Sequence, residues 1–151
     1  MATGADASPP AGRPSPWADR IGRTLMAVDA AATLVAFAGG ILIMTSVSDD
    51  RVITEAWRTL AYIVFAGLWI VLAVAPRRQW GLWELLLFHK GAITVYCFVM
   101  WDKPDAAQTA IIDLFVLVTT AVAYVLCRGW TSWRTGASEP ARGRGPATSA
   151  G

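Results

Sequence analysis

The chain is 151 residues long, with a formal net charge of +2 and a mean hydropathy of +0.45. Hydrophobic residues make up 55% of it and charged residues only 16%, whereas soluble domains carry about a quarter charged residues. The composition therefore excludes a soluble globular protein and indicates one integral membrane domain, with no room for a separate soluble domain.

Four apolar stretches occupy most of the chain. Each is long enough to cross a bilayer, because about 20 residues in a helix, at ~1.5 Å rise per residue, cover its ~30 Å hydrocarbon core. In chain order, the predicted spans are residues 25–47, 57–75, 80–101 and 106–127. The first is longer than the apolar core of a cleaved secretory signal, so we expect it to be retained. We predict an all-α membrane domain over residues 21–128, a disordered tail over residues 1–20 and a basic, mostly disordered tail over residues 129–151.

Charged residues are distributed unevenly around the predicted spans. Arginine is concentrated before the first span, between the second and third, and after the fourth, whereas the other two connections carry more acid than base. The positive-inside rule then predicts a multi-pass protein of the cell membrane with both termini in the cytoplasm. The short connections at residues 76–79 and 102–105 require antiparallel neighbours, so we expect an up-down-up-down four-helix bundle.

The first span carries an acid on a face of small side chains. The residues of this face are Asp29, Ala32, Ala36 and Gly40. Their spacing of three or four residues is helical. Because small residues let helices pack closely, we expect Asp29 to point into the protein, with Thr33 one turn on as a hydrogen-bond partner. Asp29 either holds helices together as a protonated acid or serves in a proton relay or in ligand binding.

Spans three and four carry polar residues at helical spacing. In span four these are Thr109, Asp113, Thr120 and Tyr124. At ~1.5 Å per residue, Lys90 in span three lies roughly 20 Å below the connection between the two spans, and Asp113 roughly 14 Å below it. A lysine side chain can bridge this difference, and an unpaired charge in hydrocarbon is costly. We therefore predict an ion pair between Lys90 and Asp113, with a role that is either structural or functional.

The densest group of ionisable residues is Glu84, His89 and Lys90. At ~100° per residue they point in three directions around a helix, so they cannot all line one narrow site. Glu84 either meets an arginine of the 76–79 connection near the cytoplasm or shares an acidic pocket with Asp29, which lies at a similar depth.

His89 is the only histidine, which excludes a haem held by two histidines of one chain. Tyr96, seven residues on, shares its helix face. Imidazole gains and loses a proton near neutral pH, so His89 either relays protons, binds a quinone carbonyl or makes an ordinary hydrogen bond between helices.

Several kinds of site have no signal in this sequence. There is no Walker loop, dinucleotide glycine motif, His-Glu-x-x-His or Gly-x-Ser-x-Gly, and no Cys-x-x-Cys. We interpret Cys97, Cys127 and Trp69 as packing residues. No residues have the spacing of metal ligands, so we predict no metal and no cofactor. The basic residues flank membrane spans, which suits an anionic lipid surface and not nucleic acid.

In its number of spans and its short loops, the chain resembles the small bacterial four-span proteins of the DoxX-like kind. This resemblance lies in layout and implies a four-helix membrane bundle. No functional residue is transferred from it, since a shared fold does not establish a function.

Three functions fit these features. We favour a non-enzymatic bundle whose internal polar residues pack the helices and bind a lipid-like ligand or a partner protein. The partner protein is either a second copy of the chain or another membrane protein. The second function is a membrane enzyme or redox accessory acting on a quinone, sterol or isoprenoid, with His89 and an intramembrane carboxylate in proton transfer. The third is a subunit of an oligomeric ion or proton transporter. The candidate residues are Asp29, Glu84, His89, Lys90, Tyr96, Asp113 and Tyr124, with His89 and Glu84 as catalytic candidates.

These functions make different structural demands. An enzyme requires His89 and a carboxylate to converge on one void. A structural bundle requires ionisable residues that are already paired and no void. A transporter requires polar groups that continue from one membrane surface to the other.

Overall fold

The computed structural model describes residues 14–133, which are helical apart from short connections. The helices are α1 (Pro16–Met44), α2 (Asp49–Val74), α3 (Leu82–Val99), α4 (Ala106–Cys127) and the short 3₁₀-helix η1 (Gly129–Thr131). The four long helices have the length and apolar composition needed to cross a membrane. The chain is therefore all-helical, as predicted, and is consistent with a small multi-pass membrane protein. Most of the two tails predicted to be disordered lies outside the described residues.

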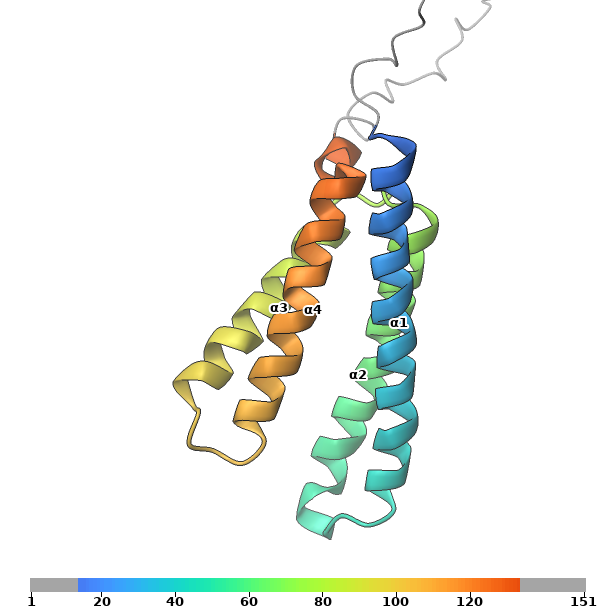
Figure 1. Cartoon of the computed structure of the whole chain (residues 1–151). Helices are drawn as coiled ribbons and strands as arrows, with labels where there is room; N and C mark the ends of the chain where they lie inside the picture. Colours follow the sequence, from blue (N-terminus) through green and yellow to red (C-terminus); the bar gives the residue numbers. More distant parts are fainter. Residues whose placement is uncertain (1–13, 134–151) are drawn as a thin grey trace, which may run out of the picture.

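The four long helices form two pairs. Figure 1 shows α1 beside α2 and α3 beside α4, with the pairs close together at one end and diverging toward the other. The first and last described residues lie where the pairs meet, which we call the terminal end; the connections 45–48 and 100–105 lie at the opposite, loop end. α1 packs against both α2 and α4, and α4 packs against α3. Contact between the pairs is therefore made largely by α1 and α4.

The first two helices begin earlier than the apolar stretches that predict them. α1 starts at Pro16, whose fixed φ suits a first turn, and the Ser15 side chain accepts a hydrogen bond from Ala18 N at 3.2 Å. Residues 16–20 are therefore helical and not part of a disordered tail. α2 starts at Asp49, with acidic residues in its first turn that suit the helix dipole. An apolar stretch predicts only the apolar part of a helix, so the polar first turns of α1 and α2 lie outside the predicted spans.

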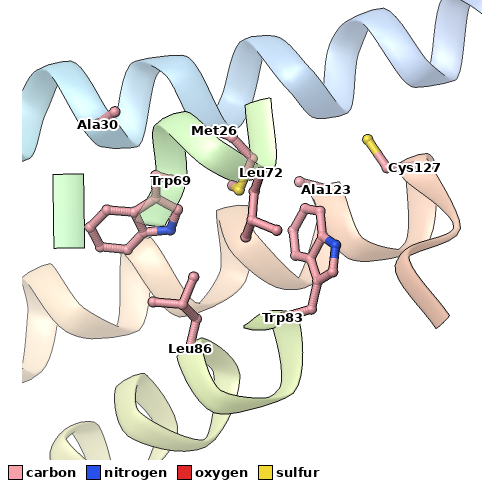
Figure 2. Close-up of a cluster of buried hydrophobic side chains, with 8 residues drawn as sticks. All are labelled: Met26, Ala30, Trp69, Leu72, Trp83, Leu86, Ala123 and Cys127. Carbon is pink, nitrogen blue, oxygen red and sulfur yellow. The ribbon is translucent and has the colours of Figure 1, made fainter. Parts of the chain in front are cut away.

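A buried apolar cluster near the terminal end, the core cluster, holds the four helices together (Figure 2). Its members are Met26, Ala30, Trp69, Leu72, Trp83, Leu86, Ala123 and Cys127. Trp69 is only 1% exposed, which confirms the packing role predicted for it, and its Nε1 donates to Thr120 Oγ1 at 3.3 Å. Trp83 Nε1 donates to Pro76 O at 2.7 Å. Both buried indoles therefore combine a large apolar contact with a satisfied N–H group.

Charged side chains connect the helix ends at the terminal end. Arg23 donates to the carbonyl oxygens of Ala73 (3.0 Å) and Val74 (2.8 Å), which belong to the last turn of α2 and lack partners within that helix. Asp19 accepts hydrogen bonds from both Arg23 and Arg77. These arginines contribute to the charge bias of the sequence, and they also join α1 to the end of α2 and to the turn that follows it.

Gly40 allows α1 and α2 to pack closely. A Cβ atom at this position would collide with Thr59 Oγ1 and lie 2.9 Å from Thr59 Cγ2. Thr59 is buried and β-branched, so its side chain has little freedom to move away. At the neighbouring Gly39, by contrast, a Cβ atom would meet no atom within 4 Å. The small-residue face of α1 is thus used against α2 at Gly40.

Replacing Gly40 with Ala should separate α1 from α2 and lower the free energy of unfolding by about 1–3 kcal/mol, as overpacking does in other cores. Gly39→Ala is the matched control. It adds the same methyl group without a clash and should be neutral or stabilising by up to ~1 kcal/mol, because alanine is the better helix former. Unfolding in denaturing detergent, followed by circular dichroism, measures both variants. Equal stability of the two would show that the helices do not meet closely at Gly40.

Candidate ligand-binding cavity

A cavity of about 350 Å³ lies between the two helix pairs, on the loop-end side of the core cluster. All four long helices line it. Its polar lining consists of Thr33, Arg58, Tyr62, His89, Lys90, Thr109 and Asp113. Trp69 belongs both to the cavity wall and to the core cluster, so the core closes the cavity toward the terminal end. The volume falls within the range of small-molecule sites in proteins, about 300–1,000 Å³.

Lys90 and Asp113 form an ion pair between α3 and α4 in the wall of this cavity. Lys90 Nζ lies 2.5 Å from Asp113 Oδ1, and the two side chains are only 12% and 11% exposed. The lysine also lies over the rings of Phe65 and Trp69, at 4.7 Å and 5.6 Å from their centroids, which extends the contact to α2. Lys90 and Asp113, whose depths below the connection are estimated from the sequence to be similar, are thus in contact in the structure. Each charge compensates the other.

A second group of paired charges lies nearer the loop end. Glu55 is only 2% exposed and accepts hydrogen bonds from Arg51 (2.9 Å) and from Arg58. Arg51 also lies 3.7 Å from Asp105, which connects α2 to the start of α4. From the sequence alone, Glu55 is placed only among the acidic residues near the connection between the first and second spans, and no role is assigned to Arg58. The signal for both is the spacing of three and four residues around Glu55, which favours ion pairs on a helix.

Three uncharged polar residues of the cavity have no side-chain hydrogen-bond partner in the part of the chain that the structure describes. This holds for both ring nitrogens of His89 and for the hydroxyls of Tyr62 and Thr109. The His89 ring packs on Phe65 of α2, with 4.7 Å between the centroids. His89 is therefore not the hydrogen-bonded bridge that is one of its predicted roles. Tyr96 does not join it, because its side chain is 59% exposed and lies outside the cavity wall.

Asp29 is buried between α1 and α4 and lies outside the cavity wall. Thr119 Oγ1 lies 2.8 Å and 3.1 Å from its two carboxyl oxygens. Thr33, the partner expected from the sequence, donates instead to the backbone carbonyl of Asp29 at 2.8 Å, because a threonine hydroxyl in a helix easily reaches the carbonyl four residues back. The arrangement favours an interhelical role for Asp29.

Glu84 lies near the terminal end, apart from the cavity. Its Oε1 atom accepts hydrogen bonds from the Tyr124 hydroxyl (2.8 Å) and from Trp133 Nε1 (3.0 Å). Arg77, an expected partner, is bound to Asp19 instead. The residues predicted to form an internal polar cluster are therefore distributed over separate places, because they lie on three helices, at different depths and on different helix faces.

No family model matches the chain, and neither does any curated protein or solved structure. The DoxX-like layout therefore stays a prediction from the number of spans and the loop lengths. Among residues 14–133, no three His, Cys, Asp or Glu side chains lie together in a way that could hold a metal ion. The ligand of this site is therefore inferred from the cavity itself.

Replacing Lys90 with Met should lower the free energy of unfolding by roughly 3–5 kcal/mol, because Asp113 is then left buried without its partner. The double variant Lys90→Met/Asp113→Leu should lose much less, since no uncompensated charge remains. Unfolding in denaturing detergent and the yield of folded protein measure the difference. If the double variant loses as much stability as the single one, the two charges do not compensate each other.

Replacing Tyr124 with Phe should cost roughly 0.5–1.5 kcal/mol, because it removes the hydrogen bond to Glu84 while keeping the ring in place. Tyr96→Phe makes the same chemical change at an exposed position and should stay within about 0.5 kcal/mol of the wild type. The same unfolding assay compares them. A Tyr124→Phe variant as stable as the control would show that Glu84 does not hold α4 at this point.

Proposed function

We propose that this protein is a non-enzymatic, multi-pass protein of the cell membrane that binds a lipid-like molecule in the cavity between its helix pairs. Its helices cross the bilayer in up-down-up-down order, with both termini in the cytoplasm. The excess of arginine around the terminal end supports this orientation, and the short connections support the order. The observation that carries the function is a cavity lined by His89, Tyr62 and Thr109, whose side-chain polar groups have no hydrogen-bond partner among the described residues.

The three candidate functions differ in what they need from this space. A purely structural bundle needs no void, yet a cavity of about 350 Å³ lies between the pairs. A transporter needs a continuous polar path, whereas the apolar core cluster lies between the cavity and the terminal end. Binding of a small molecule needs only the volume and the polar groups that are already there.

A membrane enzyme is the second candidate, and one specific observation favours it. His89 and Asp113 both line the cavity, as proton transfer on a quinone, sterol or isoprenoid would require. However, the Asp113 carboxylate is engaged by Lys90 at 2.5 Å. Catalysis would require this pair to open, whereas binding leaves it intact, so we rank binding first.

Native mass spectrometry of the protein in a mild detergent tests the proposal. We expect the wild type to retain a small molecule that is not a bulk phospholipid. Ala36→Phe adds a large ring to the cavity wall and should displace that molecule. Ala38→Phe is the matched control: it makes the same change two residues on, at an exposed position on roughly the opposite side of α1, and should leave the molecule bound.

Equal retention by the wild type and by Ala36→Phe would place the molecule outside the cavity and contradict the proposal. A wild-type spectrum that contains only bulk phospholipid would contradict it as well. The same spectra give the oligomeric mass, which shows whether a second copy of the chain is a partner.

A further inference from the structure

We infer that the occupant of the cavity is an electrically neutral amphiphile whose planar, oxygen-bearing ring accepts a hydrogen bond from His89. This inference rests on the proposed function and specifies the class of ligand. A ring with carbonyl or hydroxyl groups, such as a quinone or a phenol, has the required chemistry. The alternatives are amphiphiles of the same length with an anionic head group, such as a carboxylate or a phosphate.

The charges of the cavity wall favour a neutral head group. Lys90 is paired with Asp113, and Arg58 is paired with the buried Glu55. Each cation that faces the cavity therefore already has its counter-ion from the protein. At Lys90, an anionic head group would have to displace Asp113 and leave it buried without a partner, which is strongly unfavourable in a medium of low polarity. At Arg58 it would have to compete with the buried Glu55.

The unpaired polar groups favour a ligand that forms hydrogen bonds. A neutral imidazole carries one N–H donor, and the hydroxyls of Tyr62 and Thr109 add two further groups that can donate or accept. None of them is hydrogen-bonded within the described residues. Lipid chains offer these groups no hydrogen-bond partner, whereas a bound ligand with oxygen atoms would supply one.

The shape of one wall favours a planar ring. Tyr62, Phe65 and Trp69 lie on one side of α2, at spacings of three and four residues, and all three line the cavity. Aromatic rings pack well on flat ring systems, in stacked or edge-to-face geometry. The His89 ring of α3 packs on Phe65 in this wall, with 4.7 Å between the ring centroids. A flat head group that enters here meets aromatic surface and a hydrogen-bond donor together, while its apolar tail has Ile93, Ile112 and Val116 beside it.

Equilibrium dialysis of the detergent-solubilised protein tests the inference with three probes of matched tail length: decylubiquinone, decanoate and decyl phosphate. We expect decylubiquinone to bind saturably and the two anionic probes to bind at least about tenfold more weakly. His89→Phe, which keeps the ring and removes the N–H group, should weaken decylubiquinone binding by about five- to tenfold, the loss expected for one hydrogen bond. His89→Gln, which keeps a donor, should bind nearly as the wild type does.

The outcomes separate this inference from the proposed function. If decanoate or decyl phosphate binds more tightly than decylubiquinone, and Ala36→Phe abolishes that binding, the ligand is not neutral but the binding cavity is supported. Decylubiquinone binding that is unchanged in His89→Phe would overturn the role of His89. If Ala36→Phe changes the binding of none of the probes, the proposal that the cavity binds a ligand is wrong. Gel filtration checks that each variant is folded, and Tyr62→Phe, which removes a single hydroxyl, provides a second test should His89→Phe aggregate.

Discussion

A charge inside a membrane protein requires a partner, and the pairing of Lys90 with Asp113 is the constraint on which the rest of this arrangement depends. The pair joins α3 to α4 through a 2.5 Å contact. The same ammonium group lies over Phe65 and Trp69, so it also holds these two helices against α2. One side chain thereby fixes the relative rotation of three helices. The aromatic and polar walls of the cavity face each other because of that rotation.

Small and large side chains determine where the helix pairs touch and where they part. At Gly22, a Cβ atom would lie only 2.5 Å from Cys127 Sγ, so the absence of a side chain lets α1 approach α4 near the terminal end. Trp83 and the other members of the core cluster fill the space between the helices there. Farther along α1, Ala32 and Ala36 border the cavity instead of a packed neighbour. The pairs therefore diverge toward the loop end, as Figure 1 shows, and the polar groups of that half surround a space.

The features that could be predicted from the sequence are those that one helix or one short connection determines. The apolar length of each stretch predicts its helix, and depth below a short turn predicts that Lys90 and Asp113 can meet. Other contacts depend on how each helix is rotated against its neighbours, which the pattern of a single helix does not contain. The sequence therefore gives no sign that Thr119, and not Thr33, meets the carboxyl group of Asp29. The helical angles predict that Glu84, His89 and Lys90 cannot all share one site, but which neighbours each of them meets escapes prediction for the same reason.

The small side chains that line the cavity are themselves an argument about function. Ala32, Ala36 and Ala61 line it, and larger apolar residues at these positions would fill the volume. An unfilled void loses dispersion contacts along its whole lining, and unpaired polar groups in a medium of low polarity add a further cost. An amphiphile of the proposed kind would restore these contacts and supply a partner for His89. Because a ligand that binds only the folded state stabilises it, small residues along the cavity wall would couple the stability of the bundle to ligand binding. A purely structural bundle gains nothing from that coupling, whereas a binding protein requires it.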